Sequence, residues 1–269
     1  MLSYRHLFHA GNFADVHKHL AWLTGIHALL KKPAPFCLLD VYAGAGEYDL
    51  GSPEAGKTRE WHEGIGRLWP AADAPHGVRA YLDLIDDQTR IYPGSPMLAA
   101  GNLRAGDRLI CFELHPADYA TLKSRFANDA RVHVHRRDAR EGLAALLPPK
   151  ERRGLVLIDP PYERDAEYEE VPAMLESALA RWPDGGYLVW YPMLAADRHA
   201  AMLDAIEALQ PKRLFVHELR LLRETPGLQG SGVAWINPPW RMDETLREAA
   251  AWIASRLEAR AVLHWRIQD

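Results

Sequence analysis

The sequence contains little cysteine and no long apolar run. Only Cys37 and Cys111 occur among 269 residues, and each lies inside a short apolar stretch. This usage argues against a disulfide framework or a zinc site and predicts buried thiols in a cytoplasmic protein. No stretch approaches the roughly 18 apolar residues of a membrane-spanning helix, and the first residues hold no apolar core of a signal peptide. We therefore expect a cytoplasmic protein without a membrane partner.

An excess of positive charge is also missing. The chain has 32 Lys and Arg against 36 Asp and Glu, which gives a formal net charge of −4. This balance excludes a broad, sequence-independent coat for nucleic acid but leaves room for a local basic patch. We expect the basic residues that contact a polyanion to be few. The candidates are Arg5, Lys18, Lys57, Arg59, Arg152 and Arg153.

The apolar pattern predicts an α/β fold. Five apolar strands alternate with helices, and we expect them at 36–42, 108–114, 131–135, 154–159 and 187–191. This alternation is typical of a parallel sheet that is covered by helices on both faces. Two further strands, expected at 213–222 and 231–236, follow each other without a helix and indicate a terminal antiparallel pair. Together these elements match the doubly wound, Rossmann-like, seven-stranded methyltransferase fold.

One segment breaks this rhythm. Residues 48–92 combine short helical patterns, at about 58–69 and 77–88, with loops rich in Pro, Gly and Asp. We interpret this segment as a small helical insertion. The methyltransferase core then comprises 1–47 and 93–269, and it begins with an N-terminal basic arm and helix at 1–33.

A glycine-rich turn, Asp40-Val-Tyr-Ala-Gly-Ala-Gly46, follows the first expected strand. Glycines such as Gly44 let the backbone approach a ligand at the carboxyl end of a strand, where open α/β sheets bind ligands. The spacing departs from GxGxxG, and no Lys-Ser or Lys-Thr follows. Both facts disfavour a phosphate-binding loop, and the first disfavours a nicotinamide dehydrogenase. A plain turn is the alternative interpretation of this motif alone.

Acidic residues follow the next two expected strands. Glu113 ends one of them, where a carboxylate can accept hydrogen bonds from both ribose hydroxyls of a nucleoside cofactor. Asp138 follows the other and is placed to bind the amino group of an adenine. The alternatives are a surface acid for either residue and a helix N-cap for Asp138. The order of glycine-rich turn, strand-end Glu and strand-end Asp favours a nucleoside cofactor more than any one part does.

The motif Asp159-Pro-Pro-Tyr162 carries the most specific chemistry, and it follows the apolar run Leu155–Ile158. Asp159 and the carbonyl of Pro160 can both accept hydrogen bonds from one amino group, and Tyr162 offers a ring on which a planar base can stack. Two acceptors on an exocyclic amine direct its lone pair toward an incoming methyl group. The base must first leave its stack to be reached. A proline-rich turn before a helix is the alternative.

Two other features of the sequence are candidates for chemistry. Asn237-Pro-Pro-Trp240 looks like the same motif, but it comes last in the chain, so we expect a structural role or a place in the wall of the site. The pairs His9 with Asp15 and His17 with His19 raise a metal hypothesis. Residues two apart do not share a helix face, and no cysteines or clustered carboxylates complete a set. We expect no metal and instead a basic aromatic arm beside the site, or a solvated helix start.

Blocks spread over the whole sequence resemble the bacterial 23S rRNA adenine-N6 methyltransferase family RlmJ. They are Met1-Leu-Ser-Tyr-Arg-His6, His9-Ala-Gly-Asn12, Ala14-Asp-Val16, Lys18-His19, Ala43-Gly-Ala-Gly46, Tyr92-Pro-Gly-Ser-Pro96, Glu113-Leu-His-Pro116, Leu157-Ile-Asp-Pro-Pro-Tyr162, Trp190-Tyr-Pro192 and Ile236-Asn-Pro-Pro-Trp240. The resemblance implies a monomeric enzyme that uses S-adenosylmethionine. It implies methylation of the N6 amine of one adenosine in protein-free 23S rRNA, which is then the partner.

The resemblance also implies roles for single residues. Cofactor contacts fall on His19, Tyr42, Ser95, Glu113, Asp138 and Ala139, to which we add Gly44 of the turn. Asp159 is the acid that binds the amine, with Pro160 and Tyr162 beside it. RNA contact falls on Tyr4, to which we add His6 and Lys18. The family has His and Gly where this chain has Tyr42 and Ala139, and contacts through backbone or ring face tolerate both replacements.

Several alternatives stay open at this point. The amine could belong to an adenine in DNA, because the motif does not separate DNA from RNA. It could belong to a glutamine side chain of a release factor, although those enzymes typically carry Asn where this chain has Asp159. A catalytically silent RNA-binding protein on the same fold is a third possibility, and the intact motif argues against it.

Overall fold

The computed structural model describes residues 5–85 and 90–268. Its centre is an eight-stranded sheet in the order β10-β8-β9-β7-β6-β1-β4-β5. A two-stranded sheet of β2 (Glu47–Asp49) and β3 (Ile91–Pro93) lies apart from it. The expected α/β class with a doubly wound sheet is confirmed.

Parallel pairing joins five of the strands into one half of the sheet. They are β5 (Val132–His135), β4 (Arg108–Phe112), β1 (Cys37–Asp40), β6 (Gly154–Ile158) and β7 (Gly186–Met193). The residues of β4, β1, β6 and β7 are almost all buried, as the continuous apolar runs predict for strands covered on both faces. In the edge strand β5 only Val132 is buried. Because they are parallel, their carboxyl ends meet at one edge of the sheet, where the glycine-rich turn, Glu113 and Asp159 follow them.

The other half of the sheet is antiparallel. β9 (Gly230–Ile236) runs antiparallel to β7 on one side and to β8 (Leu214–Leu221) on the other. The expected antiparallel pair is therefore present.

The expected number of seven strands is wrong, because β10 (Ala259–Ile267) adds an eighth strand antiparallel to β8. This strand has no turn signal of glycine or proline before it. Glu258 makes the turn after the preceding helix with a left-handed φ of 51°, a conformation that favours glycine. Most of its side chains are only partly buried, so the apolar pattern does not set it apart from the helix before it.

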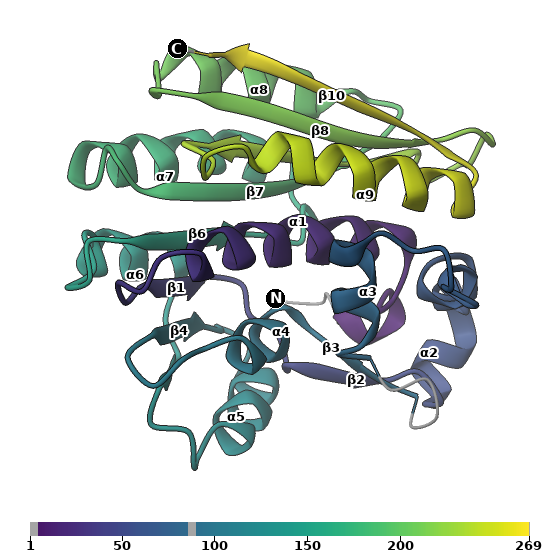
Figure 1. Ribbon diagram of the computed structural model, residues 1–269, viewed down its shortest axis with the longest axis horizontal. Coiled ribbons are helices and arrows are strands. Elements are labelled where there is room, and N and C mark those ends of the chain that lie inside the picture. The colour runs from purple at the N-terminus through teal and green to yellow at the C-terminus, as the bar shows by residue number, and fades with distance from the viewer. Residues whose placement is uncertain (1–4, 86–89, 269) are drawn as a thin grey trace.

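Helices cover both faces of the sheet (Figure 1). One face carries α1 (Phe13–Leu30), α4 (Ser95–Gly101), α5 (Pro116–Arg125) and α9 (Met242–Arg256), whose buried residues share one hydrophobic core. The other face carries α6 (Ala139–Leu146), α7 (Glu167–Arg181) and α8 (Arg198–Ala208), which share the second core. None of the helices among the described residues is long and apolar enough to cross a membrane.

Helix α1 brings its first turns to the functional edge of the sheet. Asn12 caps it, since its side-chain oxygen accepts hydrogen bonds from the backbone N–H groups of Ala14 and Asp15, both at 2.9 Å. The helix is buried nearly all round, including charged residues near its start. A charged side chain buried in this way needs a partner, and the site described below supplies it.

The segment between β2 and β3 packs against α1. It contains α2 (Pro53–Thr58), two 3₁₀ turns at Glu60–Glu63 and Ile65–Leu68, and α3 (His76–Leu82). Where we expected a helix at 58–69, the chain forms the two 3₁₀ turns instead, because Gly64 must bring its backbone against that of Gly11 and Asn12. A Cβ at Gly64 would lie 2.1 Å from the carbonyl oxygen of Gly11. The division into core and insertion stays a prediction.

Candidate functional site

A cavity of about 890 Å³ opens where the parallel strands end. Its lining includes the described residues that we assigned to the cofactor, to the amine and, in the N-terminal blocks, to RNA. These residues are His6, Lys18, His19, Tyr42, Gly44, Ser95, Glu113, Asp138, Ala139, Asp159, Pro160 and Tyr162. Of the other basic candidates for a polyanion, Arg59 lines the cavity, whereas Arg5, Lys57, Arg152 and Arg153 do not. Tyr4 lies outside the described residues. Ligand pockets commonly measure about 300–1,000 Å³, so the cavity has room for more than one small group.

The carboxylate of Asp159 is held by a buried lysine. Lys18 Nζ lies 2.5 Å from Asp159 Oδ2 and 3.0 Å from Asp15 Oδ1. Asp15 also accepts hydrogen bonds from the His6 ring, at 2.9 Å, and from the backbone N–H of Gly11. A chain of alternating charge therefore runs from the start of α1 to the end of β6.

Burial and ion pairing have opposite effects on the pKa values of these charged residues. Burial alone would lower the pKa of Lys18, but Asp15 and Asp159 raise it above its ordinary value. Burial alone would raise the pKa of Asp15, but His6 and Lys18 hold it well below its ordinary value. Both groups are therefore charged at neutral pH, as a buried ion pair requires.

The position of Lys18 differs from that expected of a basic arm on the surface. Only 5% of Lys18 is exposed, and two carboxylates already surround its ammonium group. His6 is partly buried over Asp15. RNA contact by His6 and Lys18 stays a prediction, while the structure gives Lys18 a direct place beside Asp159 that sequence reasoning missed.

Glu113 is fixed by the glycine-rich turn. Its Oε2 accepts from the backbone N–H of Gly44 at 2.8 Å, and its Oε1 accepts from that of His115 at 2.6 Å. Burial raises the pKa of Glu113, although both N–H groups act against this rise. Gly44 has φ +61°, and a Cβ there would lie 2.3 Å from the hydroxyl of Tyr48. Glycine is therefore required at the point where the turn meets the carboxylate.

Ser95 is tied to an acid inside the fold. Its hydroxyl donates to Asp40 Oδ2 at 2.6 Å, and the backbone N–H of Tyr42 donates to Asp40 Oδ1. Asp40 is fully buried, and burial raises its pKa to about 7. Asp40 opens the glycine-rich motif, yet the motif gave no sign that it would fix Ser95, a residue 55 positions away.

His19 begins a chain of buried hydroxyl groups. Its Nδ1 lies 2.9 Å from the hydroxyl of Tyr92, which lies 2.8 Å from the hydroxyl of Tyr81 on α3. The rings of His19 and Tyr92 are stacked. Burial lowers the pKa of His19 to about 3, so the ring is neutral. This contact links the segment between β2 and β3 to the cavity, and no pattern in the sequence indicates it.

Asp138 is the N-cap of α6. Its Oδ1 accepts from the backbone N–H groups of Arg140 and Glu141 at 3.0 and 3.2 Å. The alternative role that we gave Asp138 is thus present, and it does not exclude a ligand contact, because Oδ2 has no part in the cap. Ala139 is buried behind it, and Tyr42 is partly buried in the cavity wall.

Tyr162 is packed more deeply than a free stacking platform. Only 9% of it is exposed, its hydroxyl donates to the carbonyl of Trp190 at 2.9 Å, and its ring contacts Tyr168 and Trp190. Trp190 also lines the cavity, and Lys18 Nζ lies 5.9 Å from its ring centroid. Trp190 belongs to a block that the sequence flagged, but only the fold places it beside Asp159.

The family model described as "Ribosomal RNA large subunit methyltransferase D, RlmJ" matches residues 33–268. The chain belongs to the RlmJ family.

Relatives of this RlmJ-family protein match it nearly end to end. "Ribosomal RNA large subunit methyltransferase J" of Escherichia coli is 41% identical over 264 residues, which are 96% of this chain and 94% of the relative. The protein of the same name from Haemophilus influenzae is 38% identical over 276 residues, which are 100% of this chain and 98% of the relative. A crystal structure of a Legionella pneumophila protein has a TM-score of 0.88 at 33% identity, covering 95% of this chain and 98% of that one.

The second proline motif of this RlmJ-family protein lies away from the site. Ile236 pairs with Tyr187 at the start of β7, so Asn237–Trp240 lies at the amino ends of the parallel strands. Asn237 donates to the carbonyls of Pro183 and Gly185 and accepts from the backbone N–H of Arg213. The structural interpretation is confirmed, and a place in the wall of the site is wrong.

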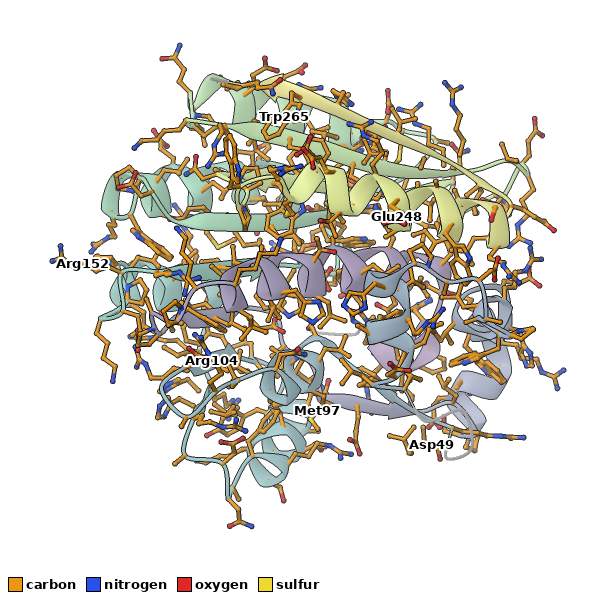
Figure 2. The ribbon with its side chains drawn as sticks, viewed as in Figure 1. Asp49, Met97, Arg104, Arg152, Glu248 and Trp265 are labelled. Atoms are coloured by element: carbon orange, nitrogen blue, oxygen red, sulfur yellow. The ribbon has the colours of Figure 1, made fainter. Side chains whose placement is uncertain are left out.

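The charge run Lys150–Arg153 also lies at the far edge, because it directly precedes the start of β6. Figure 2 shows Arg152 extending from the end of the molecule opposite α2. Arg153 is used internally, where it donates to the carbonyls of Leu29 and Ala34. We therefore no longer expect Arg152 and Arg153 to contact a substrate that is bound in the cavity.

The N-terminal histidines have partners other than a metal. His17 contacts Ser231 at 2.8 Å and His217 at 3.1 Å, and all three are buried. His9 and Asn12 contact Glu60. Among residues 5–85 and 90–268, no group of three or more His, Cys, Asp or Glu is arranged to hold a metal ion.

The contact of His9 with Glu60 makes stability depend on pH. His9 Nδ1 lies 3.0 Å from Glu60 Oε1, and this hydrogen bond raises the pKa of His9 above 6.5. A raised histidine pKa stabilises the fold below pH 6.5, and this contribution is lost as pH rises through the folded pKa. Glu60→Gln is therefore expected to lower the melting temperature at pH 6 more than at pH 8.5. Scanning calorimetry at both pH values, with the exposed Glu176→Gln as control, checks this, and an equal shift at both would contradict it.

Proposed function

We propose that this protein transfers a methyl group from S-adenosylmethionine to the N6 amine of one adenosine in 23S rRNA. We further propose that it acts in the cytoplasm as a monomer, on protein-free rRNA during ribosome assembly. The observation that carries the proposal is the meeting of Asp159-Pro160 with Glu113 and Gly44 in one cavity. Two relatives named as large-subunit rRNA methyltransferases support it.

The cavity fits a nucleoside cofactor of positive charge. Glu113 is held by two backbone N–H groups with its remaining lone pairs available for ribose hydroxyls. Gly44 is the position where a side chain would fill the turn. His19 is neutral, so it can donate or accept a hydrogen bond without adding positive charge. When bound, S-adenosylmethionine supplies a methyl group on a positively charged sulfur.

Asp159 and Pro160 are the groups that hold the target amine. The ammonium group of Lys18 binds Asp159 Oδ2, so Asp159 Oδ1 is the oxygen that accepts from the target amine. The backbone carbonyl of Pro160 is the second acceptor, since Pro160 lies beyond the last residue of β6 and lines the cavity. Two acceptors on the amino hydrogens draw the nitrogen lone pair out of conjugation and aim it at the methyl group. With S-adenosylmethionine bound, the nitrogen–methyl bond would form as the sulfur–methyl bond breaks.

The amine then releases one proton. Asp159 can accept it, and solvent can accept it equally well. Lys18 Nζ lies 2.5 Å from Asp159 Oδ2 and fixes the orientation of the carboxylate. Positioning of the amine is therefore the role that we assign to Asp159.

Glu113→Gln is expected to weaken cofactor binding by about 10- to 100-fold, which corresponds to one hydrogen bond to a charged group. The amide nitrogen of Gln would face the N–H of Gly44 or of His115, so one acceptor oxygen is lost at a point where two donors converge. Isothermal titration calorimetry with S-adenosylmethionine measures the change. Glu141→Gln, exposed on α6, is the control, and equal affinity of Glu113→Gln and the unmodified protein would contradict the assignment.

The proposed function is tested with purified protein and labelled S-adenosylmethionine. We expect label in protein-free 23S rRNA and, after digestion, in N6-methyladenosine at a single nucleotide. Duplex and single-stranded DNA are offered in parallel, because the motif itself does not separate the two nucleic acids. Label in DNA alone, or in no nucleic acid, would overturn the proposal.

A further inference from the structure

Cations at the cavity are mostly neutralised by the protein itself. Lys18 pairs with Asp15 and Asp159, Arg164 with Glu170, and Arg223 with Glu63. Carboxylates outnumber Lys and Arg in the described lining, and they are Asp15, Glu60, Glu63, Glu113, Asp118, Asp138, Asp159, Glu163, Glu167 and Glu170. Such a lining suits a cationic cofactor but repels a polyanion, so an RNA at this edge needs cations that no carboxylate of the protein already binds.

The corner between β5 and α6 supplies such cations. Arg136 and Arg137 follow the last residue of β5, and Arg140 lies in the first turn of α6. All three are exposed, and no carboxylate in the described part of the chain forms an ion pair with them. Asp138 lies among them; its Oδ1 caps α6 and its Oδ2 takes no part in the cap.

This corner lies at the functional edge of the sheet. β5 pairs in parallel with β4, and His135 is opposite Phe112, directly before Glu113. Arg137 lines the cavity itself, next to Asp138 and Ala139. β5 is also the outermost strand, so nothing in the sheet covers the corner from outside. A strand of RNA that places one base in the cavity can therefore reach all three arginines.

We propose that Arg136, Arg137 and Arg140 bind phosphates of the RNA strand that flanks the target adenosine. The inference rests on the proposed function and adds the surface that its substrate uses. Arginine suits this task, because its planar guanidinium binds a phosphate through two parallel hydrogen bonds. The contacts orient the strand without reading its sequence.

The decisive measurement is the salt dependence of RNA binding. Protein-free 23S rRNA transcript is titrated with the unmodified protein, with Arg136→Gln/Arg140→Gln and with the triple variant that adds Arg137→Gln. Each lost phosphate contact reduces the slope of log K against log salt by about 0.7–0.9, so we expect the triple variant to lose roughly 2–3 in slope. The double variant should keep its affinity for S-adenosylmethionine, measured by calorimetry, because Arg136 and Arg140 lie outside the cavity lining.

The matched control removes two equally exposed charges from the opposite edge, in Lys150→Gln/Arg152→Gln. An unchanged slope in the triple variant, or an equal loss in the control, would overturn the proposed surface. If the unmodified protein methylates 23S rRNA and the triple variant binds it as before, only this inference fails. If the unmodified protein neither binds nor methylates the RNA, the proposed function fails with it.

Discussion

Asp159→Ala is expected to lower methyl incorporation into protein-free 23S rRNA by roughly 10²–10³-fold, the usual cost of removing one group that stabilises developing charge. The substitution removes one of two acceptors for the target amine and leaves the carbonyl of Pro160. The amine is then held by one group, and its lone pair is no longer directed at the methyl group. Single-turnover assays with saturating cofactor measure the chemical step.

The Asp159→Ala protein should still fold. Lys18 keeps Asp15 as a counterion at 3.0 Å, so its ammonium group is not left alone in the interior. Melting temperature and the affinity for S-adenosylmethionine serve as controls and should change little. Unchanged methyl incorporation by a folded Asp159→Ala protein would remove Asp159 from the mechanism.

Lys18→Met is expected to have the largest effect on stability. It leaves Asp15 and Asp159 facing each other at a buried site without their shared cation. Removing one partner of a buried ion pair costs about 3–5 kcal/mol, and urea unfolding measures this change in the free energy of unfolding. Methyl transfer should fall as well, because the carboxylate of Asp159 loses the group that fixes its orientation.

A surface ion pair of equal length provides the control for Lys18→Met. Lys212 Nζ also lies 2.5 Å from a carboxylate, that of Asp184, but both side chains are mostly exposed. Exposed pairs contribute about 0–1 kcal/mol, so Lys212→Met should change stability little. If both variants lose equal stability, burial of the Lys18 cluster is not the cause of the loss in Lys18→Met. The double variant Lys18→Met/Asp15→Asn, which also removes one buried charge, should recover part of the loss.

Acid should weaken the same cluster. The folded pKa of Asp15 is lowered well below 3.8, so its contribution to stability is present above the unfolded pKa and is lost as pH falls through the folded pKa. The His6 ring contacts Asp15 Oδ2, whereas Lys18 contacts Asp15 Oδ1.

Much of the fold was predictable because four of the five parallel strands are buried on both faces. Their apolar runs are continuous, and Asn12 and Asp138 cap helices where the sequence places a capping residue. The edge strand β10 was not predictable, since its half-exposed pattern resembles neither a buried run nor a regular alternation. The segment 53–82 was only partly predictable, because the close approach of Gly64 to Gly11 depends on tertiary packing.

The site was predictable where chemistry is local in the sequence. Glu113, Asp138 and the Asp159 motif each follow a strand, and topology alone brings them to one edge. The Lys18 cluster joins residues 141 positions apart, and the contact of His19 with Tyr92 joins residues 73 apart. No periodicity records such pairs. Arg136 and Arg137 were also missed, because a short basic run in a balanced sequence looks like an ordinary solvated turn.

The packing of the segment between β2 and β3 has a consequence for how the molecule opens. Ile65, Leu68, Val78 and Tyr81 belong to the same hydrophobic core as α1 and one face of the large sheet. Detaching this segment would expose that core, so its backbone amides should exchange with deuterium only when the sheet itself unfolds. We therefore expect the segment and the catalytic edge to unfold together as one cooperative unit.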